Sequence, residues 1–304
     1  MKNKDLIAIR DMSSREILDI VKLARKLKKT PLLRKRALKD RILALVFQKP
    51  SNRTRISFEA AMVHLGGYAL YLSPWEIEMG TRESVKDVSR VISRYVDGIV
   101  ARVFSHQDVV DFARHSDVPV INGLSDRAHP CQALSDIFTI AEKMRTLKDV
   151  TVSYVGDGNN VLNSLLMVCA KTGVNMKVAT PEGYRPPEDI FDEASKIARS
   201  NKAVFELSSD PYRAVSGSDI VYTDVWISMG QEEEREKRLK DFEGFQVNAA
   251  LMGAAKEDAL IMHCLPAHRG EEITDVIDGK NSIVYDQAEN RMHVQKAILL
   301  RMLG

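Results

Sequence analysis

Six short polar segments each follow or end a predicted buried strand, and together their side chains could bind an anion and an amine. In open α/β sheets ligands bind beyond the carboxyl ends of the strands, so polar groups gathered there predict a binding site. One such segment would mean little, whereas six with complementary chemistry predict a single active site. The segments are Ser51–Arg55, Arg102, His129–Gln132, Gly156–Asn160, Asp224–Gly230 and His263–Pro266.

The segment Ser51–Arg55 reads Ser-Asn-Arg-Thr-Arg and lies between a predicted strand and a predicted helix. Backbone N–H groups at a helix N-terminus, together with two hydroxyls and an arginine, make a phosphate-binding arrangement. A plain helix cap with two surface arginines is an equally open interpretation. The segment has neither a Walker lysine nor a glycine-rich loop, so it does not predict a nucleoside-triphosphate P-loop.

Arg102 and His129 strengthen the anion hypothesis. Arg102 ends the apolar run 98–101, where an arginine is costly unless it meets an anion or a carboxylate. His129 stands immediately before Pro130, a residue favoured at the first position of a helix, and Gln132 follows in the first turn. Both polar side chains can point at a ligand. The alternatives are an ion pair for Arg102 and a structural role for His129.

The segment Gly156–Asn160 starts like a dinucleotide fingerprint, but Val161 stands where the last glycine belongs. It is therefore weak evidence for a nicotinamide cofactor. Asn159 and Asn160 could instead hold a carboxylate at the helix N-terminus. Asp224, at the end of a later strand, suits a substrate ammonium group, or else it caps the helix that follows.

Cys264 stands beside His263, a pairing that suggests a thiol nucleophile or a zinc site. The seven histidines and three cysteines of the chain show no close paired spacing, so zinc is poorly supported. Neighbouring residues on a strand point to opposite faces, so these two side chains are not expected to act on one another.

The composition is that of an ordinary globular protein. The chain has 304 residues, of which 44% are hydrophobic and 28% charged, and this length predicts two domains. Its 44 basic and 42 acidic residues leave a formal charge of +2, which gives no support to a nucleic-acid surface. Three cysteines do not predict a disulfide framework, and a cytoplasmic location is expected. The N-terminus has no signal-peptide region, and no apolar run reaches the roughly 18 residues that would predict a membrane span.

Hydrophobic patterning predicts an α/β fold with two doubly wound parallel-sheet domains. Short apolar runs alternate with helical patterns, and short connections between them indicate helices on both faces of parallel sheets. Strands are expected near 41–47, 68–73, 98–104, 118–122, 150–155, 175–180, 204–207, 219–225 and 259–264.

A helix over about 132–145 is the expected junction between the domains, because a new strand follows it and restarts the alternation. The last helix, about 289–303, is amphipathic and is expected to pack back on the first domain. The predicted domains are therefore 1–133 plus 289–304, and 134–288.

Three further segments have local signals. Ser13–Glu16 reads as a capping box that opens a structural helix, and a helix from about Ile56 is expected to end at Gly66. The densely charged segment 231–243 is predicted to be a solvated helix, since helices with alternating charges usually face water.

These segments, in this order, resemble the ornithine carbamoyltransferases of the aspartate/ornithine carbamoyltransferase family over nearly the whole chain. Ser51–Arg55 resembles the family's Ser-Thr-Arg-Thr-Arg carbamoyl-phosphate loop, and His129–Gln132 resembles its next phosphate and carbamoyl motif. Asp224–Gly230 is similar to the ornithine loop, which favours ornithine over aspartate as acceptor. The segment 263–270 resembles the family's catalytic segment, and 288–291 resembles its last carbamoyl-phosphate arginine site.

Two residues depart from the family pattern. Asn52 stands where the family has a threonine, so a backbone contact would survive there but a hydroxyl contact would not. Glu78 stands where the family has a glutamine that reaches carbamoyl phosphate in a neighbouring subunit. An acid beside a dianion is unfavourable unless it is protonated, displaced or paired.

The resemblance implies a first domain for carbamoyl phosphate and a second for L-ornithine. It implies a homo-oligomer, a trimer or an assembly of trimers, with sites between subunits and domains. The ornithine side-chain amine would attack the carbonyl of carbamoyl phosphate, and a tetrahedral species would expel phosphate to give L-citrulline, in arginine biosynthesis or degradation. No cofactor, metal, covalent intermediate, nucleic acid or membrane is implied.

The resemblance also implies which residues serve each substrate. The expected catalytic residues are Arg102, His129 and Cys264. Those expected to bind carbamoyl phosphate are Ser51, Asn52, Arg53, Thr54, Glu78, Arg102, His129, Gln132, Cys264, Leu265 and Arg291. Those expected to bind ornithine are Asn160, Asp224, Ser228 and Met229.

Three other functions stay open at the level of the sequence. An aspartate or other carbamoyltransferase would share the first motifs and differ in its amine acceptor. A nicotinamide-dependent oxidoreductase would rest on Gly156–Asn160, against which the missing last glycine counts. A binding protein that kept the anion site without catalysis is disfavoured by the presence of His129, Asp224 and Cys264.

Overall fold

The computed structural model describes residues 5–31, 33–80, 82–228 and 230–304. The chain forms two compact units, Met1–Phe138 with Glu289–Gly304 (unit 1) and Thr139–Ala288 (unit 2). The division after Phe138 falls inside helix α6 (Pro130–Lys143), the helix expected to be the junction, and it lies slightly after the expected position 133.

Unit 1 contains a four-stranded parallel sheet in the order β2-β1-β3-β4. The chain leaves β1 to form β2 on one side and returns to form β3 on the other, so the strand order reverses between β1 and β3. The strands are β1 (Ile42–Phe47), β2 (Tyr68–Leu72), β3 (Gly98–Arg102) and β4 (Val120–Leu124). The helical elements are η1 (Ile9–Asp11), α1 (Ser14–Lys29), α2 (Asn52–Leu65), α3 (Pro74–Ile77), α4 (Val85–Ile92) and α5 (His106–His115).

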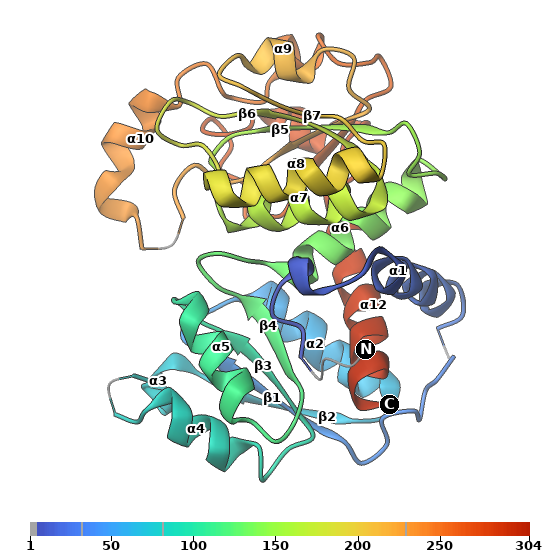
Figure 1. Cartoon of the computed structure of the whole chain (residues 1–304), viewed down its shortest axis with the longest axis vertical. Coiled ribbons are helices and arrows are strands. Elements are labelled where there is room, and N and C mark those ends of the chain that lie inside the picture. Colours follow the sequence, from blue (N-terminus) through green and yellow to red (C-terminus); the bar gives the residue numbers. More distant parts are fainter. Residues whose placement is uncertain (1–4, 32, 81, 229) are drawn as a thin grey trace. The chain divides into compact units, whose positions relative to one another are not determined.

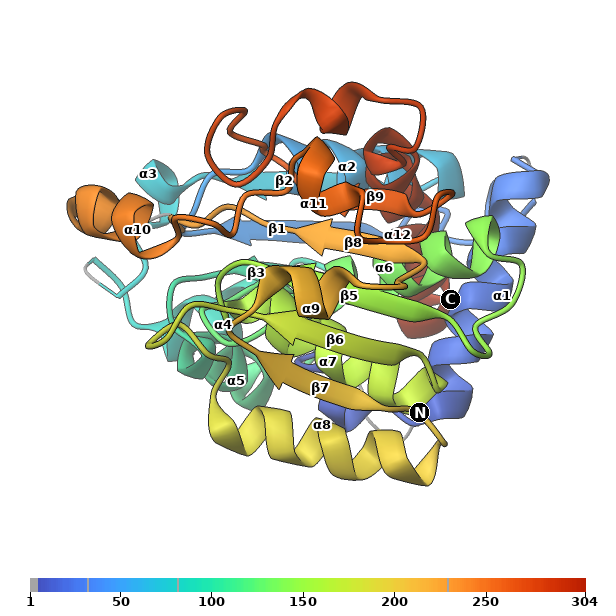
Figure 2. The ribbon, with the colours of Figure 1, turned by 90° about the horizontal axis from the view of Figure 1, so that it is seen from above.

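The core of unit 1 follows from alternation along its strands. Ala44 and Val46 of β1 point to the same face as Ile99 of β3, and they pack against Val88 of α4 and Phe112 of α5. Figures 1 and 2 show α4 and α5 on this face, while α2 lies on the opposite one. Because helices cover both faces, the inner strands are almost entirely buried and, apart from Arg102 at the end of β3, carry no charged residue.

Unit 2 contains a five-stranded parallel sheet in the order β7-β6-β5-β8-β9, which again reverses beside its first strand, between β5 and β8. Helices α7 and α8 lie on one face and α9 on the other (Figure 1), and Figure 2 shows the strand order. The strands are β5 (Thr151–Val155), β6 (Asn175–Ala179), β7 (Phe205–Ser208), β8 (Ile220–Thr223) and β9 (Leu260–His263). The helical elements are α7 (Asn160–Thr172), α8 (Glu188–Ser200), α9 (Pro211–Val215), η2 (Glu232–Glu234), α10 (Arg235–Asp241), α11 (Ala249–Met252) and η3 (Asp275–Asp278).

The last helix, α12 (Val284–Leu303), contacts α1, α2 and α6, which confirms that the C-terminus packs back on the first unit. At its end, Leu303 lies against the start of β3, where a Cβ on Gly98 would come 2.9 Å from the Leu303 Cδ2 atom. Only glycine allows this close packing without a shift. The helix begins at Val284, earlier than the expected 289, because the short segment after η3 leads directly into it.

Two sequence predictions need correction. Helix α2 begins at Asn52 rather than near Ile56, so residues 52–55 form its first turn instead of a loop before it. The segment 231–243 forms η2 and α10, but it is not solvated throughout, because the side chain of Arg238 is buried.

No membrane-spanning helix was expected from the sequence. Among the residues that it describes, no helix is both long and apolar enough to cross a membrane.

Candidate active site

The carboxyl end of β1 leads directly into the N-terminus of α2. Ser51 caps the helix, because its Oγ accepts a hydrogen bond from the Thr54 backbone N–H at 3.3 Å. The same hydroxyl donates to the Thr54 Oγ1 atom at 3.2 Å. The remaining N–H groups of the first turn have no partner within the helix, and with the helix dipole they favour a bound anion.

A buried arginine from the last helix joins this turn to α6. Arg291 donates from Nη2 to the Thr54 Oγ1 atom at 2.9 Å and from Nη1 to the Gln132 Oε1 atom at 3.0 Å. Gln132 in turn donates to the Asp136 Oδ1 atom at 2.8 Å. Three predicted site residues that are far apart in the sequence therefore form one buried network, which holds each side chain in a defined orientation.

Positive charge accumulates around His129. Burial lowers the pKa of His129 well below its usual value, and the charges of Arg291, Arg102 and Arg53 lower it further. The imidazole is therefore neutral near pH 7 and can donate one hydrogen bond without adding charge. Arg102 ends β3 and is only 6% exposed, with its Nε donating to the Lys49 carbonyl oxygen at 3.2 Å. This concentration of cations, of which Arg102 and Arg291 are buried, favours an anionic ligand.

Two of the residues expected to bind carbamoyl phosphate are exposed, whereas Thr54, Arg102, His129, Gln132 and Arg291 are buried. Asn52 is exposed as the first residue of α2. Glu78 is exposed at the end of α3, in the left-handed conformation with φ 38°. It belongs to the segment between β2 and α4 rather than to the carboxyl end of a strand.

In unit 2, three of the predicted segments meet at one carboxylate. Asp224 follows β8, and its Oδ2 accepts a hydrogen bond from the Asn159 Nδ2 atom at 2.8 Å. Its Oδ1 accepts from the Cys264 Sγ atom at 2.9 Å. Asn159 also caps α7, because its Oδ1 accepts from two backbone N–H groups of the first turn. The ends of β5, β8 and β9 thus converge where the strand order reverses.

Gly158, in the segment 156–160, allows close packing of the backbone. A Cβ on Gly158 would lie 2.5 Å from the Tyr184 carbonyl oxygen and 2.4 Å from the Pro186 nitrogen, so no side chain fits there. The Gly158 N–H donates to that same carbonyl at 2.9 Å. The glycine allows a close approach of two backbone segments, which accounts for the partial likeness to a dinucleotide fingerprint.

Asp157 lies within the predicted segment 156–160, but neither it nor its partner Arg238 was assigned a role from the sequence. Burial raises the pKa of Asp157 to about 6, against the opposing effect of Arg238, while Asp224 raises it further. Arg238 lies 3.4 Å from the Asp157 Oδ2 atom and donates to the Trp226 carbonyl at 2.9 Å. It also pairs with Glu234 at 2.9 Å. Arg238 lies among many charged residues in the sequence, and only its burial in the folded protein distinguishes it from them. Its role therefore could not be predicted from the sequence.

The other residues expected to bind the acceptor follow Asn159 or Asp224 in the sequence. Asn160 is the first residue of α7, and Ser228 is half-buried with its N–H donating to the Gln231 Oε1 atom at 3.0 Å. Met229 lies outside the described residues. Leu265 follows Cys264 with φ 58°, a left-handed conformation that is uncommon for a residue with a side chain.

The structure brings possible metal ligands together, yet the cluster does not suit a metal. Ligand atoms of Asp224, His263 and Cys264 lie within 4.8 Å of one another. Both ring nitrogens of His263 are already engaged, Nδ1 with the Leu265 N–H at 2.8 Å and Nε2 with Glu272 at 3.1 Å. A metal would have to displace one of these bonds. As expected for neighbours on a strand, His263 and Cys264 have different partners.

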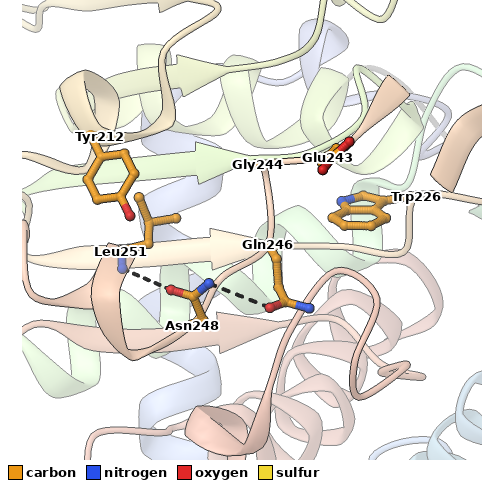
Figure 3. Close-up of a pocket in the computed structure, with 7 residues that line it drawn as sticks. All are labelled: Tyr212, Trp226, Glu243, Gly244, Gln246, Asn248 and Leu251. Carbon is orange, nitrogen blue, oxygen red and sulfur yellow. Dashed lines mark hydrogen bonds between the residues drawn. The ribbon is translucent and has the colours of Figure 1, made fainter. Parts of the chain in front are cut away.

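A pocket in unit 2 lies beside this region without being part of it. Figure 3 shows that the Asn248 side chain bridges the Leu251 N–H and the Gln246 side chain within the pocket. Neither Asp224 nor Cys264 lines it, so it is distinct from the candidate site. The lining residues are Tyr212, Trp226, Glu243, Gly244, Gln246, Asn248 and Leu251.

Comparison with known proteins also finds two domains, although there the second one includes the C-terminal helix that the structure assigns to unit 1. Residues 4–142 match the aspartate/ornithine carbamoyltransferase carbamoyl-P binding domain, and residues 148–302 match the Asp/Orn binding domain of the same family. The chain is 53% identical to the ornithine carbamoyltransferase of Pyrococcus abyssi, over 100% of this chain and 97% of that protein.

Solved structures show the same likeness. The ornithine carbamoyltransferase from Pyrococcus furiosus has a TM-score of 0.96 and 52% identity, covering 99% of this chain and 97% of that one. The anabolic enzyme from Campylobacter jejuni has a TM-score of 0.93 and 40% identity, covering 98% of each chain. With both halves of the chain matched, this protein belongs to the aspartate/ornithine carbamoyltransferase family.

Proposed function

We propose that this protein transfers the carbamoyl group of carbamoyl phosphate to the side-chain amine of L-ornithine, giving L-citrulline and phosphate. The observation that carries the proposal is the opposite charge of two groups of buried side chains. Arginines gather around His129 in the carbamoyl-P binding domain, and carboxylates gather around Asp224 in the Asp/Orn binding domain. Relatives named as anabolic support a role in arginine biosynthesis, and the composition supports a cytoplasmic location.

The arrangement in unit 1 supports a phosphate site with an adjacent oxyanion site. The first turn of α2, with Ser51, Asn52, Arg53 and Thr54, supplies N–H and side-chain donors for the phosphate oxygens. Arg102 adds charge to the phosphate and, with His129 and Thr54, faces the carbonyl oxygen. Each donor of this kind contributes about 3–4 kcal/mol to stabilising an oxyanion in comparable sites.

The proposed contacts to the carbamoyl group are mostly neutral. Gln132 and the Leu265 carbonyl hold the carbamoyl amide. Arg291 orients Gln132 and Thr54 through the bonds described above, besides adding positive charge. Its guanidinium donates to both partners at once, which a lysine could not do with the same geometry.

The arrangement in unit 2 supports an amino-acid acceptor with a cationic α-ammonium group. Asp224 receives the ammonium, Asn160 the carboxylate, and Ser228 lies beside the molecule; Met229, also expected to bind ornithine, lies outside the described residues. An acidic acceptor such as aspartate would bring a further carboxylate toward Asp224 and Asp157, which is unfavourable at short distance. The charge of this region therefore favours ornithine within a family that includes both acceptors.

The proposed reaction needs no enzyme nucleophile. The neutral ornithine side-chain amine attacks the carbonyl carbon, and the bond from carbon to the phosphate oxygen breaks with its electron pair leaving on phosphate. The proton that the amine gives up passes to the departing phosphate. Cys264 donates to Asp224 at 2.9 Å, which supports a role in positioning the acceptor amine rather than in covalent catalysis. Binding both substrates together allows proximity to supply much of the rate.

One assay tests this proposal directly. Citrulline formation from carbamoyl phosphate is measured with ornithine, acetylornithine, putrescine and aspartate as acceptors, and ornithine is expected to be strongly preferred. Equal or faster turnover of aspartate would contradict the proposal. A parallel titration with NAD is expected to show no saturable binding, which separates the carbamoyltransferase from the oxidoreductase alternative.

We also propose that the protein assembles into a trimer or a set of trimers. Strand β2 is an edge strand of its sheet and exposes Tyr68 and Leu70, while α2 exposes Ile56 and Val63. Trp75 of α3 is 86% exposed. Exposed apolar side chains on a sheet edge and on neighbouring helices are typical of an interface between subunits.

In such an assembly Glu78, which is exposed next to this surface in the sequence, extends to the phosphate of a neighbouring subunit. Light scattering of the purified protein is expected to give a mass of three chains or a multiple of three. Replacing Val63 and Leu70 by lysine is expected to lower the mass to that of one chain. A monomeric native protein would contradict the proposal.

A further inference from the structure

The segment from His263 to Glu272 forms a loop that carries Cys264 and Leu265, and its two ends are fixed by the same buried carboxylate. Glu272 accepts a hydrogen bond from the His268 backbone N–H at 2.5 Å and lies 3.1 Å from the His263 Nε2 atom, both through Oε1. Its backbone is also anchored, because the Glu272 carbonyl accepts from the Val247 N–H at 2.9 Å.

The hydrogen bonds decide which nitrogen of His263 carries the proton. The Leu265 N–H donates to the His263 Nδ1 atom at 2.8 Å, so Nδ1 must be an acceptor without a proton. The ring proton is therefore on Nε2, which donates to Glu272. A continuous chain of hydrogen bonds thus runs from the Glu272 carboxylate through the imidazole to the backbone of Leu265.

This chain ends at a residue with an unusual backbone conformation. Leu265 has φ 58°, which is sterically unfavourable for a residue with a Cβ. The bond from its N–H to His263 stabilises that conformation and sets the direction of the Leu265 carbonyl. Since Cys264 lies between His263 and Leu265, its thiol is placed by the same bonds.

The Glu272 carboxylate is costly as a purely structural group. Its side chain is fully buried, and within the described part of the chain its Oε2 atom has no hydrogen-bond partner. The nearest cationic candidate is the half-exposed His268, whose Nδ1 atom is 3.7 Å from Oε2. An apolar residue of similar size would avoid this desolvation cost, so an acid at this position indicates a requirement beyond packing.

We propose that Glu272 is a positioning residue for carbamoyl transfer, which acts through His263 to fix the Leu265 carbonyl and the Cys264 thiol. The inference rests on the function proposed above, because it assigns a role within that reaction. A carboxylate that orients a histidine in a defined tautomer is a recurrent device of active sites, and here the oriented group is the backbone of a substrate-binding loop.

The first test compares Glu272→Gln and Glu272→Ala with Glu271→Gln, a matched control in the same loop. Among the described residues Glu271 pairs with the half-exposed Arg235 and forms no hydrogen bond with His263, so its substitution is expected to leave turnover unchanged. Glu272→Ala is expected to lower kcat about 100-fold, since a displacement of about 1 Å in a reacting group has an effect of that size. Glu272→Gln retains an acceptor for both donors and should fall in between.

The relative changes in kcat and KM distinguish a loss of positioning from a general loss of structure. The phosphate is held in unit 1, so KM for carbamoyl phosphate should change far less than kcat in both Glu272 variants. The double variant Glu272→Gln with His263→Asn should be no slower than His263→Asn alone, because both substitutions interrupt one chain. If the reductions in kcat caused by the two substitutions multiply in the double variant, the inference is wrong.

A measurement without turnover completes the test. Cys131 and Cys169 are buried, so iodoacetamide should modify mainly Cys264, with Cys264→Ser as the blank. The alkylation rate of Cys264 is expected to rise several-fold in both Glu272 variants and to stay unchanged in Glu271→Gln. If the native protein forms citrulline but the Glu272→Gln variant keeps the native kcat and alkylation rate, the inference is wrong. If the native protein forms no citrulline, the proposed function fails instead.

Discussion

The two units place their site residues in the same way but differ in the charge of those residues. Each places polar groups at the carboxyl ends of parallel strands where the strand order reverses, and each uses a helix N-terminus there. In unit 1 the buried charges are the arginines around a neutral His129. In unit 2 two carboxylates, Asp224 and Asp157, lie near one another, and burial raises the pKa of Asp157 to about 6 against the opposing charge of Arg238. Two parallel sheets with the same kind of reversal therefore leave the ligand to be decided by a few side chains.

The two regions hold a central charged side chain in a similar way. Two hydrogen bonds to neutral side chains orient Arg291, and an amide and a thiol orient Asp224. In both units these bonds fix the direction of a charged group before any substrate binds. Such an arrangement is expected where charge has to be stabilised in a bound substrate.

The largest effect is expected from removing positive charge in unit 1. Arg102→Ala should lower kcat/KM for carbamoyl phosphate by about 1,000-fold or more, since it removes both a phosphate contact and an oxyanion donor. The KM for ornithine should change little, and circular dichroism should show an intact fold. Arg102→Lys restores the charge but not the planar fork, and it should recover only part of the loss. Near-native kinetics for Arg102→Ala would show that it serves only as a structural ion-pair residue.

The buried acid of unit 2 should affect stability in a direction set by its raised pKa. The folded protein keeps the Asp157 proton up to about pH 6, whereas the unfolded chain loses it near its ordinary value of 3.8. The folded state then binds more protons, so this carboxyl group reduces the free energy of unfolding as pH rises from about 4 to 6. The total change is about 3 kcal/mol, at 1.36 kcal/mol for each unit of pKa.

Asp157→Asn isolates this contribution, because asparagine does not titrate. The free energy of unfolding of the native protein minus that of Asp157→Asn should fall between pH 4 and pH 7, as measured by urea denaturation. If the difference rises with pH instead, the pairing with Arg238 outweighs the cost of burial.

Neutralising the central carboxylate should affect the acceptor alone. Asp224→Asn is expected to lower kcat/KM for ornithine about 100-fold, since a charge-assisted contact of about 1.5–3 kcal/mol is lost. Binding of carbamoyl phosphate, followed by isothermal titration calorimetry, should be close to native. An equal loss for both substrates would mean that Asp224 supports the fold rather than the acceptor.

The smallest effect is expected at the thiol. Cys264→Ser keeps a donor for the Asp224 Oδ1 atom, so turnover should fall about tenfold or less, in line with the roughly 1 kcal/mol of an ordinary hydrogen bond. Mass spectrometry of the native protein during turnover should detect no carbamoyl-cysteine. A trapped adduct, or a folded but inactive serine variant, would indicate covalent catalysis.

The strands were predictable because their signals are local. All nine expected strand positions overlap strands of the structure, since each buried parallel strand is a short apolar run bounded by polar turns. Helix starts were less accurate. Helix α2 begins at Asn52, because the Ser51 cap provides a stronger start than the apolar periodicity that begins near Ile56.

The site was only partly predictable, for a related reason. Polar residues at strand ends can be identified in sequence, and that pattern indicated Arg102 and Asp224. Arg238 and Glu272 lie in charged stretches away from strand ends, and nothing in their immediate sequence distinguishes them from solvated neighbours. Their exclusion from water follows from packing against segments far away in the chain.

The sequence by itself therefore determined the order of strands and helices, the opposite chemistry of the two regions and the family. These follow from periodicity, caps and residue types that act over a few neighbouring positions. Only the tertiary structure decided the partners of each buried charge, such as Thr54 and Gln132 for Arg291 or His263 for Glu272. A hydrogen bond depends on position and direction in space, and those are set by chain segments that meet only after folding.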